Sequence, residues 1–261
     1  MKLEVYPATT FKEYLEVLNT VNEEPMIELN PQGIHSIMMD PKHVYMCELT
    51  LPDSFFDIWE IEENEKIQVN LPAILKALNK VTKKENLRFN YTYKLGPKLD
   101  GSPQEKENEC IELSLISDYT RRKTVECLDL LEEETPSPRI YFKNKARLTI
   151  DIFKRILEDF NGNSEHITIE GINDSIQFKT DSDTYRDFVE LDKHNDHILE
   201  LYNEENSKTT YTINCILPFI KKAQKIAEVI TLEYTQDMPL KIDVELPQGT
   251  LIFYVAPCIG V

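Results

Sequence analysis

The chain has 261 residues, of which 41% are hydrophobic, and a formal net charge of −17. This composition supplies ordinary hydrophobic cores, while the negative field repels phosphate and argues against simple wrapping around nucleic acid. No apolar run approaches the roughly 20 residues that cross a bilayer, so no membrane contact is expected. The five cysteines are scattered, and Met1 opens into a strand-like alternation without a signal peptide. This predicts a soluble, intracellular protein with reduced thiols.

Two segments of the chain occur twice, in the same order. Leu71–Ala77 (LPAILKA) returns as 217–223 (LPFIKKA), and the pattern Phe11-Lys12-x-x-Leu15-Glu16 returns in 153–158. The two shifts, 146 and 142 positions, are nearly equal, which indicates a duplicated domain. We therefore predict domains at 1–128 and 139–261. The connector between them, at 129–138, has acidic residues and prolines that favour an extended, exposed segment.

The first half predicts a helix within 5–22, because Phe11, Tyr14, Leu15 and Leu18 share one face. A hairpin is expected from 27–29 to 34–37 across a turn at 30–33, followed by strands at 44–51 and 66–69. Pro72 suits a first helical turn, so a second helix is predicted at 73–81. Strands at 87–93, 110–116 and 123–128 complete this half, with a polar surface loop at 94–108.

The second half repeats this order. It predicts a strand at 139–149, and a helix at 151–160 that Asp151 caps and that 161–163 (Asn-Gly-Asn) ends. Strands follow at 166–170, 175–179 and 185–191, then a hairpin of 198–202 with 209–214. Pro218 is expected to open the fourth helix, and strands at 229–234, 240–246 and 250–255 finish the sheet. Mostly antiparallel strands with two helices per half indicate an α+β fold.

Basic side chains gather on the exposed faces of the predicted helices. They are Lys12 in the first helix, beside two glutamates; Lys76, Lys80, Lys83 and Lys84 in the second; Lys154 and Arg155 in the third; and Lys221, Lys222 and Lys225 in the fourth. Two interpretations stay open: solvated helix faces, or a common surface that faces phosphate. No aromatic residues interleave with these lysines and no base-reading helix is present, so the second interpretation favours sequence-independent contact with a duplex.

The chain resembles the sliding clamps of the proliferating cell nuclear antigen (PCNA) family, in its archaeal and eukaryotic form. Four motifs carry the resemblance: Met39-Asp40-Pro41-Lys42-His43-Val44, Val69-Asn70-Leu71, Met238-Pro239-Leu240 and Phe253-Tyr254-Val255-Ala256-Pro257. They occur in the family's order and near its spacing, and the similarity extends from Val5 to Ile259.

This resemblance implies the DNA clamp fold, with two topologically equivalent domains, and a pseudo-sixfold ring of three subunits whose twelve helices line a central hole. It implies a processivity factor of DNA replication and repair that encircles double-stranded DNA, and not an enzyme; no cofactor or metal is expected. Implied partners are DNA polymerase, the clamp loader, flap endonuclease and DNA ligase, bound through short peptides. The compartment would be the cytoplasm and nucleoid of an archaeon or the nucleus of a eukaryote, and homotrimer and heterotrimer both stay open.

The resemblance also assigns site residues. The basic residues above would face DNA. A pocket for partner peptides would use Met39, His43, Val44, Met46, Leu130, Leu131, Pro239, Tyr254, Ala256 and Pro257. The connector departs from the family pattern, because Glu133 and Thr135 stand where apolar residues are usual, and this puts its contact with peptides in question.

Ring closure would pair 121–127 of one subunit with 184–191 of the next. The implied interface residues are Arg121, Arg122, Lys123, Tyr185, Asp187 and Val189, with Asp181 and Asp183 as further acidic partners of the basic strand. The alternative is that both strands are merely edges that charge protects from aggregation.

Two other functions are possible alternatives. A clamp-like ring could serve damage signalling or transcription with the same fold. An enzyme would rely on 192–197 (Asp-Lys-His-Asn-Asp-His), where His194 and His197 have a spacing that can bind metal. Isolated ligands in a polar turn make a metal site the weaker interpretation, and no phosphate loop or nucleophile motif is present.

Overall fold

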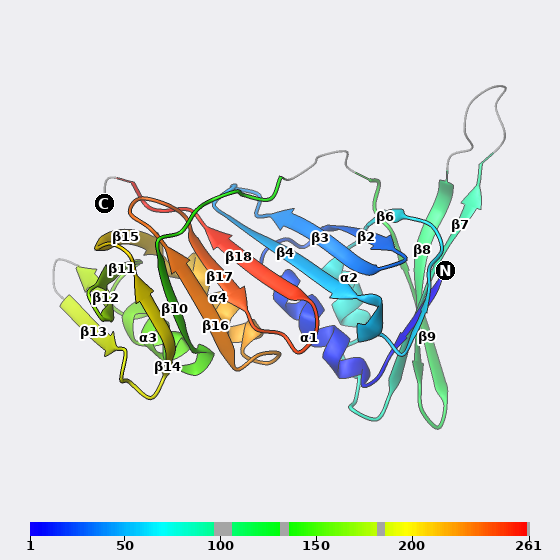
Figure 1. Cartoon of the computed structure of the whole chain (residues 1–261). Coiled ribbons are helices and arrows are strands. Elements are labelled where there is room, and N and C mark those ends of the chain that lie inside the picture. The colour runs from blue at the N-terminus through cyan, green and yellow to red at the C-terminus, as the bar shows by residue number, and fades with distance from the viewer. Residues whose placement is uncertain (97–105, 131–135, 182–185, 260–261) are drawn as a thin grey trace. The chain divides into compact units, whose positions relative to one another are not determined.

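A computed structural model of the chain describes residues 1–96, 106–130, 136–181 and 186–259. The chain forms two compact units (Figure 1). The first unit comprises Met1–Met38 and Leu49–Thr135, and the second comprises Met39–Glu48 and Pro136–Val261. Segment Met39–Glu48 thus groups with the second unit, which the duplication did not suggest. The domain boundaries at 128 and 139 stay a prediction, since half of the expected connector lies outside the described residues.

The first unit contains two helices and two antiparallel sheets. The helices are α1 (Ala8–Leu18) and α2 (Leu71–Ala77), and a 3-10 turn, η1, covers Asp53–Phe55. One sheet has the order β5-β1-β7-β8-β9 and the other runs β4-β3-β2-β6. The strands are β1 (Lys2–Val5), β2 (Met26–Asn30), β3 (Gly33–Met39), β4 (Tyr45–Pro52), β5 (Ile58–Glu60), β6 (Glu65–Gln68), β7 (Asn86–Leu95), β8 (Lys106–Ile116) and β9 (Thr120–Glu126).

The second unit repeats this plan. Its helices are α3 (Ile150–Asn161) and α4 (Ile213–Ala223), and its sheets run β14-β10-β16-β17-β18 and β13-β12-β11-β15. The strands are β10 (Asn144–Thr149), β11 (His166–Ile172), β12 (Ser175–Asp181), β13 (Arg186–Asp192), β14 (Ile198–Asn203), β15 (Ser207–Thr212), β16 (Val229–Tyr234), β17 (Leu240–Val244) and β18 (Thr250–Val255). Two antiparallel sheets with two helices in each unit confirm the predicted α+β clamp architecture.

Each helix pair packs together and buries the apolar stripe that the sequence predicts. α1 contacts α2 and α3 contacts α4, and α3 also contacts strands of both sheets of its unit. In α1 the residues Phe11, Tyr14, Leu15 and Leu18 are all buried, and in α3 Phe153 is fully buried. Burying one such side chain contributes roughly 1.5–3 kcal/mol. Because the apolar side of each helix faces its sheets, its polar side must face outward.

The predicted end of the second helix is wrong. α2 ends at Ala77, and the next residues form tighter turns in which Asn79 N–H donates to the Lys76 carbonyl (3.4 Å) and Val81 N–H donates to that of Leu78 (3.2 Å). Asn and the β-branched Val and Thr that follow are weaker helix formers than Lys or Leu. Lys80, Lys83 and Lys84 therefore lie in turns beyond the helix.

The fourth helix begins earlier than predicted. α4 starts at Ile213, so Pro218 lies inside it. Ile213 and Ile216 are fully buried at helical spacing, and this burial offsets the hydrogen bond that Pro218 cannot donate to the Asn214 carbonyl. Lys225 lies in the turn that follows the helix.

Three smaller predictions also fail. Asp151 does not cap α3: the cap position is Thr149, and Asp151 instead pairs with Arg155 one turn on. Segments 198–202 and 209–214 do not form a hairpin, because β14 pairs with β10 and β15 pairs with β11, in different sheets. The strand expected at 139–149 begins only at Asn144. In the described part of the chain, no helix is long and apolar enough to cross a membrane.

Candidate functional site

The helix face of the first unit carries exposed lysines. Lys12 on α1 is half-buried, and its ammonium group lies 3.5 Å from the Glu16 carboxylate. Lys76 on α2 and Lys80 in the following turn are exposed. Lys83 and Lys84 are also exposed, next to the start of β7. Of these five basic side chains, Lys12 and Lys76 stand on the helices, and the other three stand in the turns that follow α2.

The helix face of the second unit has a mixed charge pattern. Lys221 of α4 lies 3.1 Å from Glu158 of α3, and Lys154 of α3 donates to the Gln224 side chain (2.9 Å). Arg155 pairs with Asp151 at 3.1 Å, and Lys222 is half-buried. The sequence interpretation missed the acidic residues of α3, although their i, i+4 spacing from the basic ones was readable.

The helical segments differ in charge from the rest of the chain. Segments 8–18, 71–84, 150–161 and 213–225 carry ten basic and five acidic side chains, whereas the whole chain has a net charge of −17. Such a surface attracts an anionic polymer weakly while the remaining surface repels it. The chemistry fits sequence-independent phosphate contact, because ammonium groups on flexible stems carry no base-reading geometry.

The basic strand predicted at a subunit interface is partly used inside the first unit. Arg121 of β9 pairs with the buried Glu85 and donates to the Lys80 carbonyl (3.3 Å). Burial alone would raise the pKa of Glu85, but its bonds with Arg121 and Thr82 hold that pKa below its usual value. Lys123 donates to the carbonyl of Ala77 (2.9 Å), the last residue of α2. Arg122 lies on the other face of the strand and is exposed.

Both strands of the predicted interface lie at the edges of their sheets. β9 pairs only with β8, and β13 pairs only with β12, among the strands that the structure describes. On β13, Asp187 accepts a hydrogen bond from Asn163 (3.1 Å) and Val189 is half-buried. Tyr185 and Asp183, together with the side chain of Asp181, lie outside the described residues.

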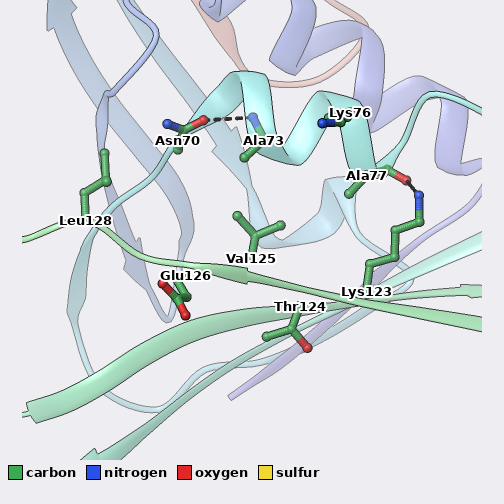
Figure 2. Close-up of a pocket in the computed structure, with 9 residues that line it drawn as sticks. All are labelled: Asn70, Ala73, Lys76, Ala77, Lys123, Thr124, Val125, Glu126 and Leu128. Carbon is green, nitrogen blue, oxygen red and sulfur yellow. Dashed lines mark hydrogen bonds between the residues drawn. The ribbon is translucent and has the colours of Figure 1, made fainter.

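A groove of about 720 Å³ lies beside the β9 edge (Figure 2). α2 and β9 form its two walls. Its lining residues are Asn70, Ala73, Lys76, Ala77, Lys123, Thr124, Val125, Glu126 and Leu128. The Asn70 side chain accepts from Ala73 N–H (2.8 Å) and so caps α2 at one end, while Lys123 holds the other end. The groove thus has a largely apolar floor and two lysines at its rim.

Several of the predicted peptide-pocket residues meet in the second unit. Ala256 N–H donates to the Val44 carbonyl (2.8 Å), which joins the 39–48 segment to the end of β18. The buried Asp40 carboxylate shapes this segment, because it accepts from the N–H groups of Lys42, Val44 and Tyr45 at 2.6–2.9 Å. The intervening His43 is exposed and has a positive φ of 57°. This role of Asp40 was not identified from sequence.

The remaining predicted pocket residues differ in exposure. Met46 and Tyr254 are buried, and burial raises the pKa of the Tyr254 hydroxyl. Met39, Pro239, Ala256 and Pro257 are half-buried. Pro239 precedes Leu240, which pairs with Val255 on β18, so it lies close to Ala256. Leu130 is exposed and belongs to the first unit, and Leu131 lies outside the described residues.

The histidines of the rival metal site are engaged in local contacts. His197 Nδ1 lies 3.0 Å from the Thr149 hydroxyl, and its Nε2 lies 3.4 Å from the Arg155 guanidinium. His194 donates its backbone N–H to Asp192 (2.7 Å). Within the described ranges, no group of three or more His, Cys, Asp or Glu side chains is arranged to hold a metal ion.

Curated relatives and solved structures are similar to this chain over both of its units. Relatives named DNA polymerase sliding clamp are 25% identical in Nitrosopumilus maritimus (94% of this chain, 93% of the relative) and 24% identical in Pyrococcus abyssi (96% and 95%). The fold matches the crystal structure of PCNA from Thermococcus kodakaraensis with a TM-score of 0.85 and 20% identity, covering 98% of this chain and 99% of that one. It also matches the PCNA2–PCNA3 complex of Sulfolobus tokodaii with a TM-score of 0.84 and 23% identity, over 98% and 99%.

Family models match each half separately. Residues 1–92 match the model of the PCNA N-terminal domain, and residues 138–259 match that of the C-terminal domain. The two matches occur in the order that the duplicated fold requires and together cover most of the chain. With its clamp fold, its duplicated helices and both domain matches, this chain belongs to the proliferating cell nuclear antigen family.

Proposed function

We propose that the chain is a subunit of a sliding clamp that encircles double-stranded DNA and tethers DNA polymerase as a processivity factor, without catalytic activity of its own. The observation that carries this proposal is the excess of basic over acidic residues in the four helices and the turns that follow α2 and α4, in a strongly acidic member of this family. Helices that face a duplex need positive charge, whereas an acidic exterior keeps the outside of the ring off DNA.

Sliding requires weak contacts. Ammonium groups such as Lys76 and Lys221 meet any phosphate equally well, so they hold no preferred register on DNA. The acidic neighbours on α1 and α3, Glu16 and Glu158, weaken the attraction further. Retention on DNA then comes from ring topology and not from affinity.

Ring closure is proposed to use the free edges of β9 and β13. Neither strand has a second neighbouring strand among the described residues, and such a sheet edge readily accepts another strand. A heterologous head-to-tail contact closes into a ring when the rotation between neighbours divides a full turn, and three subunits are proposed here. The PCNA2–PCNA3 complex of Sulfolobus tokodaii shows that different chains of this fold occur together.

Partner enzymes are proposed to bind through short peptides on the surface that includes Val44, Pro239, Tyr254 and Ala256. DNA polymerase, a clamp loader, flap endonuclease and DNA ligase are the expected partners. Val44, Pro239 and Ala256 are half-buried and Tyr254 is buried; an apolar surface of this kind, where a strand end meets a loop, suits a peptide with an aliphatic or aromatic anchor. Tyr254→Ala should weaken such a peptide at least about tenfold while the mass of the assembly stays unchanged; unchanged affinity contradicts this surface.

The proposed function is tested by measuring DNA synthesis on primed circular DNA by a replicative DNA polymerase, with and without the clamp. Lys76→Glu with Lys221→Glu should abolish stimulation by the clamp at moderate salt, because both helix pairs lose positive charge. Lys145→Glu with Lys193→Glu changes the same total charge on a strand and a turn away from the helices, and should leave stimulation intact.

Two outcomes contradict the proposal. If the helix variant and the control variant stimulated DNA synthesis equally, the helix face would not be the surface that contacts DNA. An assembled ring that loads on DNA without stimulating any polymerase would instead favour a role in damage signalling or transcription.

A further inference from the structure

Two of the five cysteines come together in the second unit. Cys215 is the third residue of α4, and Cys258 lies in the segment 256–259 that follows β18, named here the C-terminal tail. Both are free, half-buried thiols. The proposed function uses neither of them, so their position asks for an account of its own.

The C-terminal tail reaches the start of α4 along the edge of β15 (Figure 1). Cys258 N–H donates to the Thr210 carbonyl (2.8 Å), and Cys258 Sγ lies 3.3 Å from the Thr212 hydroxyl. Thr212 directly precedes α4 and stands at its N-cap position. The sulfur of Cys258 therefore lies at the N-terminus of this helix. The next residue, Ile259, is 91% exposed, so the tail leaves the packed surface directly after Cys258.

Helical geometry brings Cys215 to the same place. Residues three apart on a helix are neighbours, at roughly 5–6 Å between their Cβ atoms, and helix side chains lean toward the N-terminus. Cys215 comes three residues after Thr212, so its thiol leans toward the Thr212 hydroxyl and thus toward Cys258. The two thiols are close enough to interact electrostatically.

The surroundings of Cys215 include charges of both signs. Burial and the Asp40 carboxylate raise the pKa of the Cys215 thiol, and Cys258 acts in the same direction, whereas Lys42 lowers it. A helix N-terminus also stabilises a thiolate. Access differs between the two thiols as well, because Cys258 lies at the exposed end of the tail. Cys258 is therefore the thiol that a small molecule reaches first.

The first unit offers a comparison, because it also has two neighbouring cysteines. Cys110 of β8 lies opposite Glu126 of β9, and Cys127 N–H donates to the Glu109 carbonyl (2.9 Å). Successive side chains of a strand point to opposite faces, so the thiols of Cys110 and Cys127 lie on opposite faces of the sheet. Burial raises the pKa of the Cys127 thiol to about 12. This pair is near in space but is not aligned for a bond.

We propose that Cys215 and Cys258 form a reversible disulfide by exchange with a small-molecule disulfide, and that this bond tethers the C-terminal tail to the start of α4. The inference goes beyond the clamp function and depends on neither DNA nor a ring. A disulfide needs Cα atoms about 4.4–6.8 Å apart. The end of the tail can adjust to this distance, because its packing stops at Cys258.

The exchange proceeds in two steps. The Cys258 thiolate attacks one sulfur of the small disulfide, which forms a mixed disulfide and releases one small thiolate. The Cys215 thiolate then attacks the Cys258 sulfur, which forms the bond between the two cysteines and releases the second small thiolate. The released thiolates take up the two protons that the cysteines lost. Two protein thiols are thus oxidised, and one small disulfide is reduced to two thiols.

The tether would act on the surface that is proposed to bind peptides. Ala256 and Pro257 directly precede Cys258, and Ala256 N–H donates to the Val44 carbonyl (2.8 Å). The disulfide would hold the other end of the tail on α4. Oxidation should therefore slow hydrogen exchange of the Cys258 N–H at least about tenfold, because its bond to the Thr210 carbonyl opens less often.

Oxidised glutathione, added to the full wild-type chain at mildly alkaline pH, tests the inference. Two of the five thiols should disappear, the monomer mass should fall by two hydrogen atoms, and peptide mapping should join Cys215 to Cys258. Cys110→Ser with Cys127→Ser is the matched control and should lose the same two thiols. Cys215→Ser should stop at a glutathione adduct on Cys258.

Three outcomes overturn the inference: a wild-type chain that keeps all its thiols, one that keeps a glutathione adduct on Cys258, and a covalent dimer in place of the bond within one chain.

Hydrogen exchange of the oxidised and reduced chains tests the tether itself. The protection of the Cys258 N–H should be gained on oxidation and lost again on addition of a reducing agent, whereas the amide of Ile230, inside β16, should exchange equally in both forms. Equal exchange of the Cys258 N–H in both forms contradicts the tether.

Discussion

The two units differ in the side chain that their second helix places against their last strand. Ala77 is the seventh residue of α2, which begins at Leu71, and Phe219 is the seventh residue of α4, which begins at Ile213. Phe219 is buried, and its ring stacks on that of Phe253 in β18 with centroids 4.3 Å apart. Ala77 instead lines the groove, together with Val125 of β9.

The last strands of the two units, β9 and β18, also differ in what lies beside them. In the second unit the 39–48 segment covers the end of β18 through the bond between Ala256 and Val44. In the first unit β9 has no second neighbour among the described strands. The second unit thus fills the space between its last helix and last strand with its own aromatic rings, whereas the first unit has a groove there.

The largest expected effect is on the stability of the second unit, where the rings of Phe219 and Phe253 stack. Phe219→Ala removes a fully packed ring and should lower the free energy of unfolding by about 3–5 kcal/mol. Denaturant unfolding at fixed protein concentration measures the loss. Tyr141→Ala, at a side chain that is 74% exposed in the same unit, is the matched control and should cost less than about 1 kcal/mol. Equal losses would show that the stacked pair does not hold the second unit together.

The stability of the first unit depends on the ion pair between Arg121 and Glu85. Arg121→Ala leaves Glu85 buried without its partner, which should cost about 3 kcal/mol. Arg147, whose guanidinium pairs with Glu245 on an exposed sheet face, is the control, because surface pairs contribute about 1 kcal/mol or less. Comparable losses in thermal unfolding of the two alanine variants would contradict the structural role of Glu85.

Lowering the pH should reduce the stability that the same ion pair contributes. The folded-state pKa of Glu85 is lowered from its usual value of 4.5, so its contribution is fully present above that value and is lost as the pH falls through the folded-state pKa. Between about pH 6 and about pH 3, the difference in unfolding free energy between the wild type and Glu85→Gln should therefore shrink. Glu62→Gln, on an exposed loop, should show no such convergence. A constant difference across this range contradicts the assignment.

Filling the groove of the first unit should weaken its association with a neighbouring subunit. Ala73→Phe places a ring in the groove, and should weaken subunit association about tenfold if the neighbour enters that space. The stability of the separated chain should change by less than about 1.5 kcal/mol, because the groove offers room for the ring. Analytical ultracentrifugation measures the association. An unchanged trimer would show that the groove stays empty in the ring.

Much of the fold followed from the sequence because its signals are local and repeated. The apolar stripe of α1 and the hairpin around 30–33 depend on spacing and turn chemistry, which act within a few residues. Helix ends were less predictable. The identical Leu-Pro step begins a helix at Leu71 but lies inside one at Leu217, since burial of Ile213 and Ile216 in the tertiary structure extends α4 backward.

The site could be predicted only in part. The lysine-rich helices and the two edge strands were visible as charge patterns, but three lysines of the second helix proved to lie in turns. The pairing of Arg121 with Glu85, 36 residues earlier in the chain, depends on the packing of β9 against the end of α2. The same holds for the groove, because a small residue in a repeat does not reveal which space it leaves open.

The smallest expected effect concerns how the two copies begin their helices. Asn70 caps α2 through its bond with Ala73 N–H (2.8 Å), whereas Thr212 before α4 makes no such bond and its hydroxyl lies near the Cys258 sulfur (3.3 Å). Asn70→Ala should therefore cost about 1 kcal/mol, and Thr212→Ala less. The short α2 depends more on its cap, because a helix of seven residues has few internal hydrogen bonds of its own. Chemical denaturation of both variants checks the ranking, and a larger loss for Thr212→Ala would show that the two helices do not start by different means.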